Sequence, residues 1–341
     1  MADFVFATCL PGVEPALKLD VARTRPELRF AFSRPGLVTF KSTRAVTADD
    51  TPGSVFAHVW GRSIGAASDP ATAAIQLASL GATRVHVFAR EPEAGPGARA
   101  DGGRPDDPVG QDSTGSVSWL APWQALGPGG PAAVGELVAD VIVGGAPGES
   151  AWLGVHRHDR FRLPNPGGAI PVDVPGDAPS RAYAKIEEAI AWAGLPVEHG
   201  HAALEIGAAP GGAVLALARR GVEVWGVDTG ELAPAVLALP NVHHIAKKVG
   251  ALRWEELPAR IDWLLVDVNL APQVALHEVA RLMPRLRTTL RGAVFTLKLN
   301  DWTFVAELPA LVERIRQMGL PDVRMRHLPS NRREICAIGL R

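Results

Sequence analysis

Apolar and polar positions follow two different patterns along this chain. From Ser180 onward, short apolar runs alternate with segments in which apolar residues recur at helical spacing. Alternating strands and helices are typical of a mostly parallel, doubly wound α/β sheet. Because only a short segment separates the last two strands, we expect them to pair antiparallel at one edge. The expected strands are 202–206, 222–227, 242–245, 263–268, 293–297, 323–327 and 334–340, and the expected helices are 181–192, 212–220, 274–290 and 304–318.

The first half of the chain lacks this regular alternation and favours an α+β fold without repeats. Residues 91–117 are dense in Gly, Pro, Asp and Ser, which predicts a flexible surface insertion. Residues 158–179 are rich in Arg, Pro, Gly and Asp, so we place a linker there and the second domain at 180–341. The expected strands of the first half are 4–9, 54–59, 83–88 and 151–156, and its expected helices are 13–23, 70–80 and 131–143.

Composition limits the possible classes of protein. The 341 residues are 47% hydrophobic and 21% charged, which is typical of a globular protein of two domains. The chain has no apolar run of membrane-spanning length and no secretory signal at its start, so we expect a cytoplasmic protein. Cys9 and Cys336 lie far apart, and His243 and His244 have no partners at ligand spacing, so we expect neither a disulfide framework nor a metal site.

A glycine-rich turn follows the first strand of the second half. Residues 204–212 read Leu-Glu-Ile-Gly-Ala-Ala-Pro-Gly-Gly, and small residues at this position let a ligand approach the backbone at the end of the strand. Asp228 closes the next strand, where its carboxylate is expected to accept hydrogen bonds from ribose hydroxyls. An ordinary tight turn is the alternative interpretation. The candidate cofactor-binding residues are Glu205, Gly207, Ala209, Pro210, Gly211, Gly212, Asp228 and Asp267.

The same phrase resembles the cofactor motif of the FtsJ-like family of ribose 2′-O-methyltransferases. That resemblance implies a Rossmann-like domain, S-adenosylmethionine as cofactor, and a Lys-Asp-Lys-Glu tetrad. Each member of the tetrad has a match in this chain. Lys185 lies in Ser-Arg-Ala-Tyr-Ala-Lys, Asp267 ends the fourth strand, Lys298 ends the fifth, and Glu334 opens the last strand after Ser-Asn-Arg-Arg.

The chemistry of ribose methylation explains such a tetrad. A 2′-hydroxyl is a weak nucleophile at neutral pH and needs both positioning and a base. Two lysines held close together are expected to have one pKa pulled down toward neutrality. The resemblance implies that Lys298 is the base, that Lys185 orients the hydroxyl, and that Asp267 and Glu334 fix the lysines.

Within the family, the chain is more similar to the bacterial enzymes that methylate a cytidine ribose of large-subunit rRNA. The matching stretches are 171–188, 327–334 and Leu-Pro-Gly-Val-Glu at 10–14. This resemblance implies an N-terminal region made of a small ferredoxin-like subdomain at 1–50 and a THUMP-type RNA-binding domain at 51–157. One departure is Lys-Lys-Val-Gly at 247–250, where the family places an acidic residue for adenine and this chain has Val249.

Three functions remain open from the sequence. The leading hypothesis is an enzyme that methylates RNA, with large-subunit rRNA as its partner, without a membrane or a metal. The first alternative is a non-catalytic RNA-binding or ribosome-assembly protein, which Val249 and the net charge of −1 favour. The second is a small-molecule methyltransferase, which leaves the N-terminal region without a role.

Because the net charge is near zero, any RNA contact must come from a local basic patch, such as Arg157, Arg160 and Arg162 or Arg332 and Arg333. The oligomeric state is not indicated.

Overall fold

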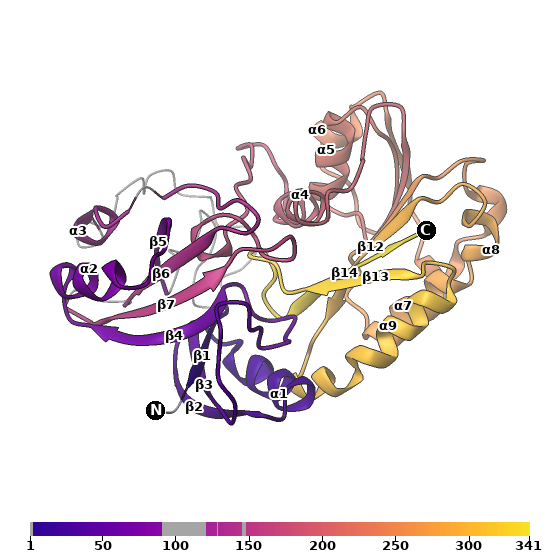
Figure 1. The fold of residues 1–341 in the computed structure, drawn as a ribbon. Coiled ribbons are helices and arrows are strands. Elements are labelled where there is room, and N and C mark those ends of the chain that lie inside the picture. Colours follow the sequence, from indigo (N-terminus) through magenta and orange to yellow (C-terminus); the bar gives the residue numbers. More distant parts are fainter. Residues whose placement is uncertain (1–2, 91–120, 128, 145–147) are drawn as a thin grey trace. The chain divides into compact units, whose positions relative to one another are not determined.

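The structure, a computed structural model, describes residues 3–90, 121–127, 129–144 and 148–341 (Figure 1). It divides into two compact units, Met1–Ala169 and Ile170–Arg341, each described by itself below. The division falls inside the segment 158–179 that the sequence marked as a linker. The insertion expected at 91–117 lies outside the described residues.

The described residues of the first unit form a seven-stranded sheet with helices packed on it. The strand order is β2-β3-β1-β4-β7-β6-β5, and every neighbouring pair is antiparallel except β5 and β6. Helix α1 packs against β2 and β3, and α2 packs against β4. The elements are β1 (Phe4–Thr8), α1 (Glu14–Thr24), β2 (Leu28–Arg34), β3 (Leu37–Ser42), β4 (Trp60–Ala67), α2 (Pro70–Ala78), β5 (Arg84–Ala89), α3 (Ala121–Gln124), β6 (Leu137–Val143), β7 (Ala151–Arg157) and η1 (Pro166–Gly168).

The helix expected at 131–143 is wrong, because its second part is the strand β6. This strand lies between β5 and β7, and six of its seven residues are buried. A short continuous apolar run fits a buried helix as well as a buried strand. The β-branched residues of Leu-Val-Ala-Asp-Val-Ile-Val are the signal that favours the strand.

Two further expectations for the first unit are wrong. Residues 54–59 form turns, not a strand, and are fastened to α1 because the buried Asp20 carboxylate accepts hydrogen bonds from Ser54 Oγ at 2.8 Å and Val55 N at 3.1 Å. The hairpin of β2 and β3 was missed. Its signal in the sequence is Pro35-Gly36, a dipeptide that is typical of turns.

The second unit is a seven-stranded sheet in the order β10-β9-β8-β11-β12-β14-β13. Strands β8 to β12 are parallel, and β14 and β13 are antiparallel at one edge. This confirms the predicted Rossmann-like α/β fold. The elements are α4 (Ala182–Ala193), β8 (Ala202–Ile206), α5 (Gly212–Arg219), β9 (Glu223–Val227), α6 (Pro234–Leu237), β10 (Val242–Ile245), η2 (Val249–Ala251), η3 (Trp254–Glu256), β11 (Trp263–Val266), α7 (Pro272–Ala280), α8 (Met283–Leu286), β12 (Gly292–Lys298), η4 (Trp302–Glu307), α9 (Leu308–Gln317), β13 (Asp322–Arg326) and β14 (Glu334–Leu340).

Helices cover both faces of this second sheet. In Figure 1, α4, α5 and α6 lie on one side of it, and α7, α8 and α9 lie on the other. Helix α4 places Tyr183, Ile186 and Ile190 in the core, at the spacing of one helical face. Lys185 is not part of that core.

Prolines divide two segments that the sequence predicted as single helices. Helix α7 ends at Ala280, and Pro284 lies in the first turn of the separate helix α8. Proline has no N–H to donate and its ring clashes with the carbonyl four residues earlier, so a helix does not run through it undisturbed. Pro309 likewise stands in the first turn of α9, after the 3₁₀ segment η4.

Candidate active site

Two glycines shape the loop between β8 and α5. Gly207 has φ +88°, and a Cβ there would lie 2.2 Å from the backbone oxygen of Asp267. A Cβ on Gly212 would lie 2.3 Å from Ser180 Oγ, just before α4. Only glycine fits either position, since real Cβ contacts are not this short. The end of β8 is therefore packed directly on the residue after β11, and the start of α5 on the start of α4.

Four predicted site residues meet at the carboxyl ends of the central strands. Asp267 directly follows β11, and Lys298 is the last residue of β12, where it pairs in register with Glu334, the first residue of β14. Lys185 comes from α4 and completes the group. Residues separated by up to 149 positions in the sequence thus share one edge of the sheet because parallel strands end together there.

The four side chains form a ring of alternating charge. Lys298 Nζ lies 2.7 Å from Asp267 Oδ1 and 2.5 Å from Glu334 Oε2. Lys185 Nζ lies 3.1 Å from Asp267 Oδ2 and also pairs with Glu334 Oε1. Each carboxylate therefore bridges both lysines. The side chains are only 8% to 18% exposed, so solvent screens these ion pairs weakly.

The electrostatics of the ring are opposite to the expectation for Lys298. Burial by itself would lower the pKa of Lys298, but the carboxylates of Asp267 and Glu334 outweigh burial and raise it above its ordinary value. Burial likewise favours a higher pKa for Asp267, but the two lysines hold it below its usual range. The expectation was that one of the two lysines has a lowered pKa, and for Lys298, the expected base, the direction is the opposite in the protein by itself. The charged forms of Lys298 and Asp267 are therefore both favoured by their neighbours.

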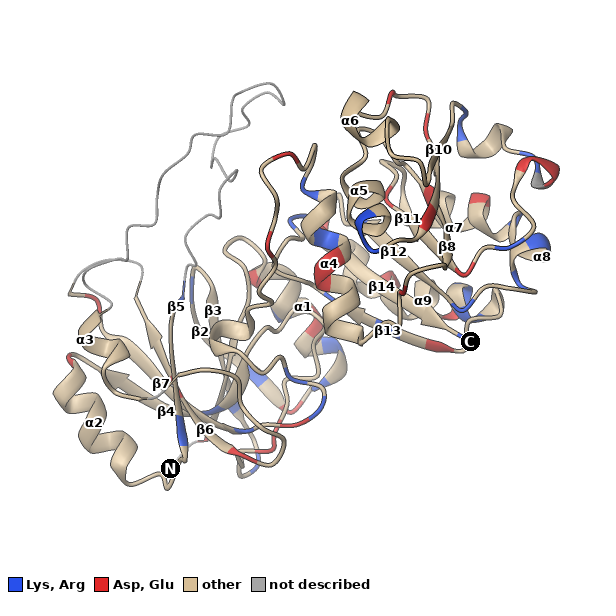
Figure 2. Cartoon of the chain, turned by 90° about the horizontal axis from the view of Figure 1, so that it is seen from above, with Lys and Arg blue, Asp and Glu red and all other residues tan. Residues whose placement is uncertain are grey.

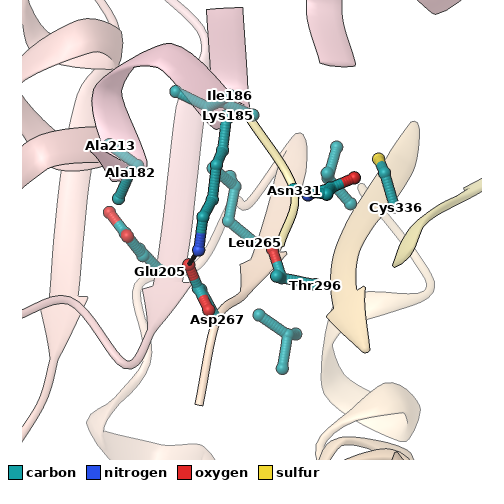
Figure 3. Close-up of a pocket in the computed structure, with 12 residues that line it drawn as sticks. Ala182, Lys185, Ile186, Glu205, Ala213, Leu265, Asp267, Thr296, Asn331 and Cys336 are labelled. Carbon is teal, nitrogen blue, oxygen red and sulfur yellow. Dashed lines mark hydrogen bonds and ion pairs between the residues drawn. The ribbon is translucent and has the colours of Figure 1, made fainter. Parts of the chain in front are cut away.

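A third acidic residue, Glu205, lies beside the ring in β8. Figure 3 shows Lys185 extending to Asp267 with Glu205 next to them, and the three line a small cavity of about 20 Å³, enough for about one water. Burial, followed by the nearby charges of Asp267 and Asp228, raises the pKa of Glu205 well above its ordinary value. Its Oε2 atom has no hydrogen-bond partner among the described residues.

Asp228 fastens the glycine-rich loop to the end of β9. Its Oδ2 accepts a hydrogen bond from Ala209 N at 3.1 Å, and its Oδ1 accepts one from Gly230 N at 2.9 Å. Pro210 O in turn accepts a hydrogen bond from Ala233 N at 2.9 Å, which ties the loop to the start of α6. The loop is therefore held by backbone hydrogen bonds on two sides, and each oxygen of Asp228 keeps a free lone pair for a ligand.

Sequence reasoning missed the contact that joins α4 to the segment before Glu334. Glu188 is 4% exposed, and its carboxylate accepts hydrogen bonds from Ser330 N at 2.8 Å and Ser330 Oγ at 2.7 Å. Burial raises the pKa of Glu188 to about 7. Lys185 lies one helical turn before Glu188, and Ser330 lies shortly before Glu334. The contact therefore positions both partners of the ion pair between Lys185 and Glu334. The signal in the sequence was a glutamate three residues after the lysine.

The basic residues named from the sequence fall into different environments. Arg332 and Arg333 are exposed directly before Glu334, and partial burial together with the Arg332 charge lowers the pKa of Arg181, which directly precedes α4. In the first unit, Arg162 is 7% exposed, donates to the Trp60 carbonyl, and stacks over the Trp60 ring at 4.5 Å. The expectation that Arg162 grips phosphates is therefore wrong, because its guanidinium is part of the interior.

The described residues hold neither a metal-binding cluster nor a membrane-spanning helix. No group of three or more His, Cys, Asp or Glu side chains there is arranged to hold a metal ion. His243 instead stacks on Trp225 at 4.7 Å and lies 3.0 Å from Glu223. None of the helices seen in the described ranges has the length and apolar character needed to cross a membrane.

No protein-family model matches the chain. Part of it is similar to curated proteins named ribosomal RNA large subunit methyltransferase M. The protein of Alkalilimnicola ehrlichii is 38% identical over 160 residues, which are 44% of this chain and 42% of the relative. Those of Azoarcus sp. and Chromohalobacter salexigens are 33% and 32% identical over 55% and 50% of this chain, and over 53% and 49% of their own length. The matches thus span about half of the relatives' length, and over that part they confirm the predicted resemblance to rRNA methyltransferases.

Proposed function

We propose that this protein is an S-adenosylmethionine-dependent methyltransferase that methylates a ribose 2′-hydroxyl of large-subunit rRNA. The observation that carries the proposal is the ring of Lys185, Asp267, Lys298 and Glu334 at the strand ends, directly beside the glycine-rich loop. The similarity of part of the chain to rRNA large subunit methyltransferases supports the same reaction class. Fold alone would not support it, because this scaffold serves many methyl acceptors.

The loop at the end of β8 suits S-adenosylmethionine. Glu205 offers a buried carboxyl oxygen without a partner among the described residues, which fits a cationic amino group reached through one water. Asp228 keeps acceptor capacity for ribose hydroxyls. The backbone of Gly207, Ala209, Pro210, Gly211 and Gly212 would line the rest of the cofactor site, with Asp267 at the boundary between the cofactor and the ribose.

In the proposed mechanism, the chain's residues position the hydroxyl and manage its proton. When bound, S-adenosylmethionine supplies an electrophilic methyl group, and its sulfonium charge favours the neutral form of nearby lysines. Lys185 orients the 2′-hydroxyl, and Lys298 accepts its proton once Lys298 itself has become neutral. Asp267 and Glu334 hold the two amino groups in place. The raised pKa of Lys298 means that this neutral form is scarce without ligands.

The proposed partner is RNA, bound in the cytoplasm by both units. We assign the first unit as an RNA-binding region with a ferredoxin-like part at 1–50 and a THUMP-type part at 51–157. Its mostly antiparallel sheet with helices is compatible with that assignment. Arg332 and Arg333 are exposed directly before Glu334, and we assign them contacts to phosphates beside the target ribose.

The alternative is a non-catalytic RNA-binding protein, and the segment after β10 is the observation that favours it. Lys247 pairs with Glu256 there, and the Val249 carbonyl accepts a hydrogen bond from Arg281 at 2.7 Å, so the segment is ordered without offering a carboxylate at Val249. Reduced affinity for the adenine of the cofactor would follow.

A thermal-shift titration separates the two functions. Binding of S-adenosylmethionine to the folded protein raises its Tm by mass action. We expect such a rise, and we expect labelled methyl to pass from S-adenosylmethionine to large-subunit rRNA from cells that lack the protein. RNA binding with no Tm rise and no label in rRNA would favour the non-catalytic alternative.

A further inference from the structure

A second cluster of basic side chains lies at the opposite ends of the parallel strands of the second sheet. A groove of about 720 Å³ opens there, and its lining includes Arg260, Asp262, Arg291 and Arg341. Arg260 precedes β11, Arg291 precedes β12, and Arg341 follows β14, which runs in the opposite direction. All three arginines are therefore at the amino ends of the parallel strands, whereas the ring of lysines and carboxylates is at their carboxyl ends.

Asp262 holds two of these arginines in fixed orientations. Its side chain is 3% exposed, and it accepts hydrogen bonds from Ala202 N at 2.9 Å, from Arg260 Nε and Nη2, and from Arg291 Nε at 3.2 Å. Burial favours a higher pKa for Asp262, but the Ala202 N–H and the two guanidinium groups lower it, so the carboxylate remains charged. A single buried anion thus organises two cations.

The outer sides of these guanidinium groups are available to a ligand. The side chains of Arg260 and Arg291 are 53% and 52% exposed. Both terminal nitrogens of Arg291, and Nη1 of Arg260, have no hydrogen-bond partner among the described residues. A guanidinium is always charged and presents paired N–H groups that match a phosphate. Holding its Nε on Asp262 orients that pair outward.

Further arginines continue this basic surface on the neighbouring helix. Arg341 donates to the backbone oxygen of Arg287, which directly follows α8, and Arg285 lies within α8. Figure 2 shows Lys and Arg gathered at α8. Three arginines against one aspartate in the groove contrast with the net charge of −1 for the whole chain. The groove is the kind of local positive patch that a polyanion requires.

We propose that this groove binds backbone phosphates of the RNA substrate at a distance from the methylated nucleotide. The proposal rests on the proposed function, since it takes RNA as the substrate. Along β12, the seven residues from Gly292 to Lys298 separate the groove from the ring by about 20 Å. A nucleotide in the active site does not reach that far, so the groove selects for a large, folded RNA rather than for a short strand.

The test compares RNA binding by full-length variants. Arg291→Gln removes one oriented guanidinium, Arg341→Gln removes a groove arginine that does not touch Asp262, and Arg219→Gln is the matched control. Arg219 also pairs with one carboxylate, that of Asp177, but does not line the groove. Dissociation constants for large-subunit rRNA and for an oligonucleotide too short to span the two sites are measured as a function of salt, without cofactor.

We expect Arg291→Gln and Arg341→Gln each to weaken rRNA binding about three- to tenfold and to reduce the slope of log K against log salt by about 1. The affinity of the two groove variants for the short oligonucleotide should equal that of the unaltered protein. The affinity of Arg219→Gln for rRNA should also be unchanged. Equal rRNA affinity in all variants, or equal losses for the short oligonucleotide, would overturn the proposal. If Arg291→Gln does not fold, Arg341→Gln decides the matter.

Methyl transfer is scored separately from binding. At saturating rRNA, the groove variants should keep the kcat of the unaltered protein, because they change affinity for a distant part of the substrate. Loss of rRNA affinity in the groove variants of a protein that transfers no methyl group would support the groove while contradicting the proposed function. Full transfer with no effect of the groove variants on affinity would do the reverse.

Discussion

The parallel strands of the second sheet have a carboxylate between two cations at each of their ends, here called the carboxyl edge and the amino edge. The two ends differ in the kind of cation. At the carboxyl edge, Asp267 bridges Lys185 and Lys298, and at the amino edge, Asp262 bridges Arg260 and Arg291. Both aspartates directly flank β11, one after it and one before it. A carboxylate with two cationic partners is therefore not by itself a catalytic site.

The difference lies in which cations can give up a proton. The environment inside a protein can shift the pKa of a lysine far enough for it to lose its proton, whereas an arginine remains charged in any protein environment. The carboxyl edge, where Glu334 adds a second bridging carboxylate, is thus suited to proton transfer. The amino edge is suited to holding permanent charge toward an anion. This comparison leads to four predictions of decreasing size.

The largest effect is expected at Lys298. Both Lys298→Ala and Lys298→Arg should lower the rate of methyl transfer by about 10³-fold, as expected for loss of a general base. Arginine keeps the positive charge and donors for Asp267 and Glu334, so it separates charge from proton transfer. Single-turnover transfer to rRNA measures the rate, and Tm reports folding. A Lys298→Arg variant with nearly full activity would show that the cation matters and the base does not.

Replacing each of the two aspartates by asparagine compares the two ends of the sheet directly. Asp267→Asn leaves two lysines without one of their bridging anions and should lower kcat by about 10²-fold. Asp262→Asn, at the other end of β11, should leave kcat within about twofold and weaken rRNA binding only, because Arg260 and Arg291 lose their fixed orientation. Steady-state kinetics with rRNA separate kcat from KM. Equal losses of kcat in both variants would contradict the division of roles.

Glu334→Gln should move the pH profile of the reaction. Asp267 and Glu334 raise the pKa of Lys298, so transfer should increase with pH as the neutral form of Lys298 becomes more abundant. Removing the Glu334 charge lowers that pKa and shifts the rising limb toward lower pH by about one unit. The log of kcat/KM measured between pH 6 and 10 tests the shift. A profile that does not move would remove Lys298 as the titrating group.

The smallest effect concerns the contact between Glu188 and Ser330. Burial raises the pKa of Glu188 to about 7 in the folded protein, above its ordinary value. The stability that this residue contributes is therefore present at low pH and is lost as pH rises through about 7. Glu188→Gln cannot ionise, so its Tm relative to the unaltered protein should increase by a few degrees between pH 5 and pH 8. A constant difference would mean that Glu188 is ionised at both values.

Much of the second unit was predictable because its local signals agree with its fold. Apolar runs bounded by polar residues predicted the strands that carry Asp267 and Lys298, and parallel topology brings their ends together. The contact of Glu188 with Ser330 was not predictable, since a polar residue 142 positions away is its partner. The raised pKa of Lys298 also depends on distances that no pattern supplies.

The first unit was predicted less well for a physical reason. Strand β6 is buried on both faces, so its side chains do not alternate between apolar and polar. Strand β2 is an edge strand in which Phe30 and Phe32 are exposed. Its apolar residues therefore do not mark a buried face, and the pattern of apolar and polar positions does not reveal the strand. The arginines of the amino edge were overlooked because Arg260 and Arg291 are distant in sequence and gain meaning only through Asp262.

The central claim is that the carboxyl edge transfers a methyl group to a ribose 2′-hydroxyl. Its most direct test is nucleoside mass spectrometry of large-subunit rRNA incubated with the protein and isotopically labelled S-adenosylmethionine, with Lys298→Arg as the matched control. We predict one labelled 2′-O-methylated nucleoside with the unaltered protein and none above background with the variant. Label on a base, or equal ribose label in both reactions, would contradict the account.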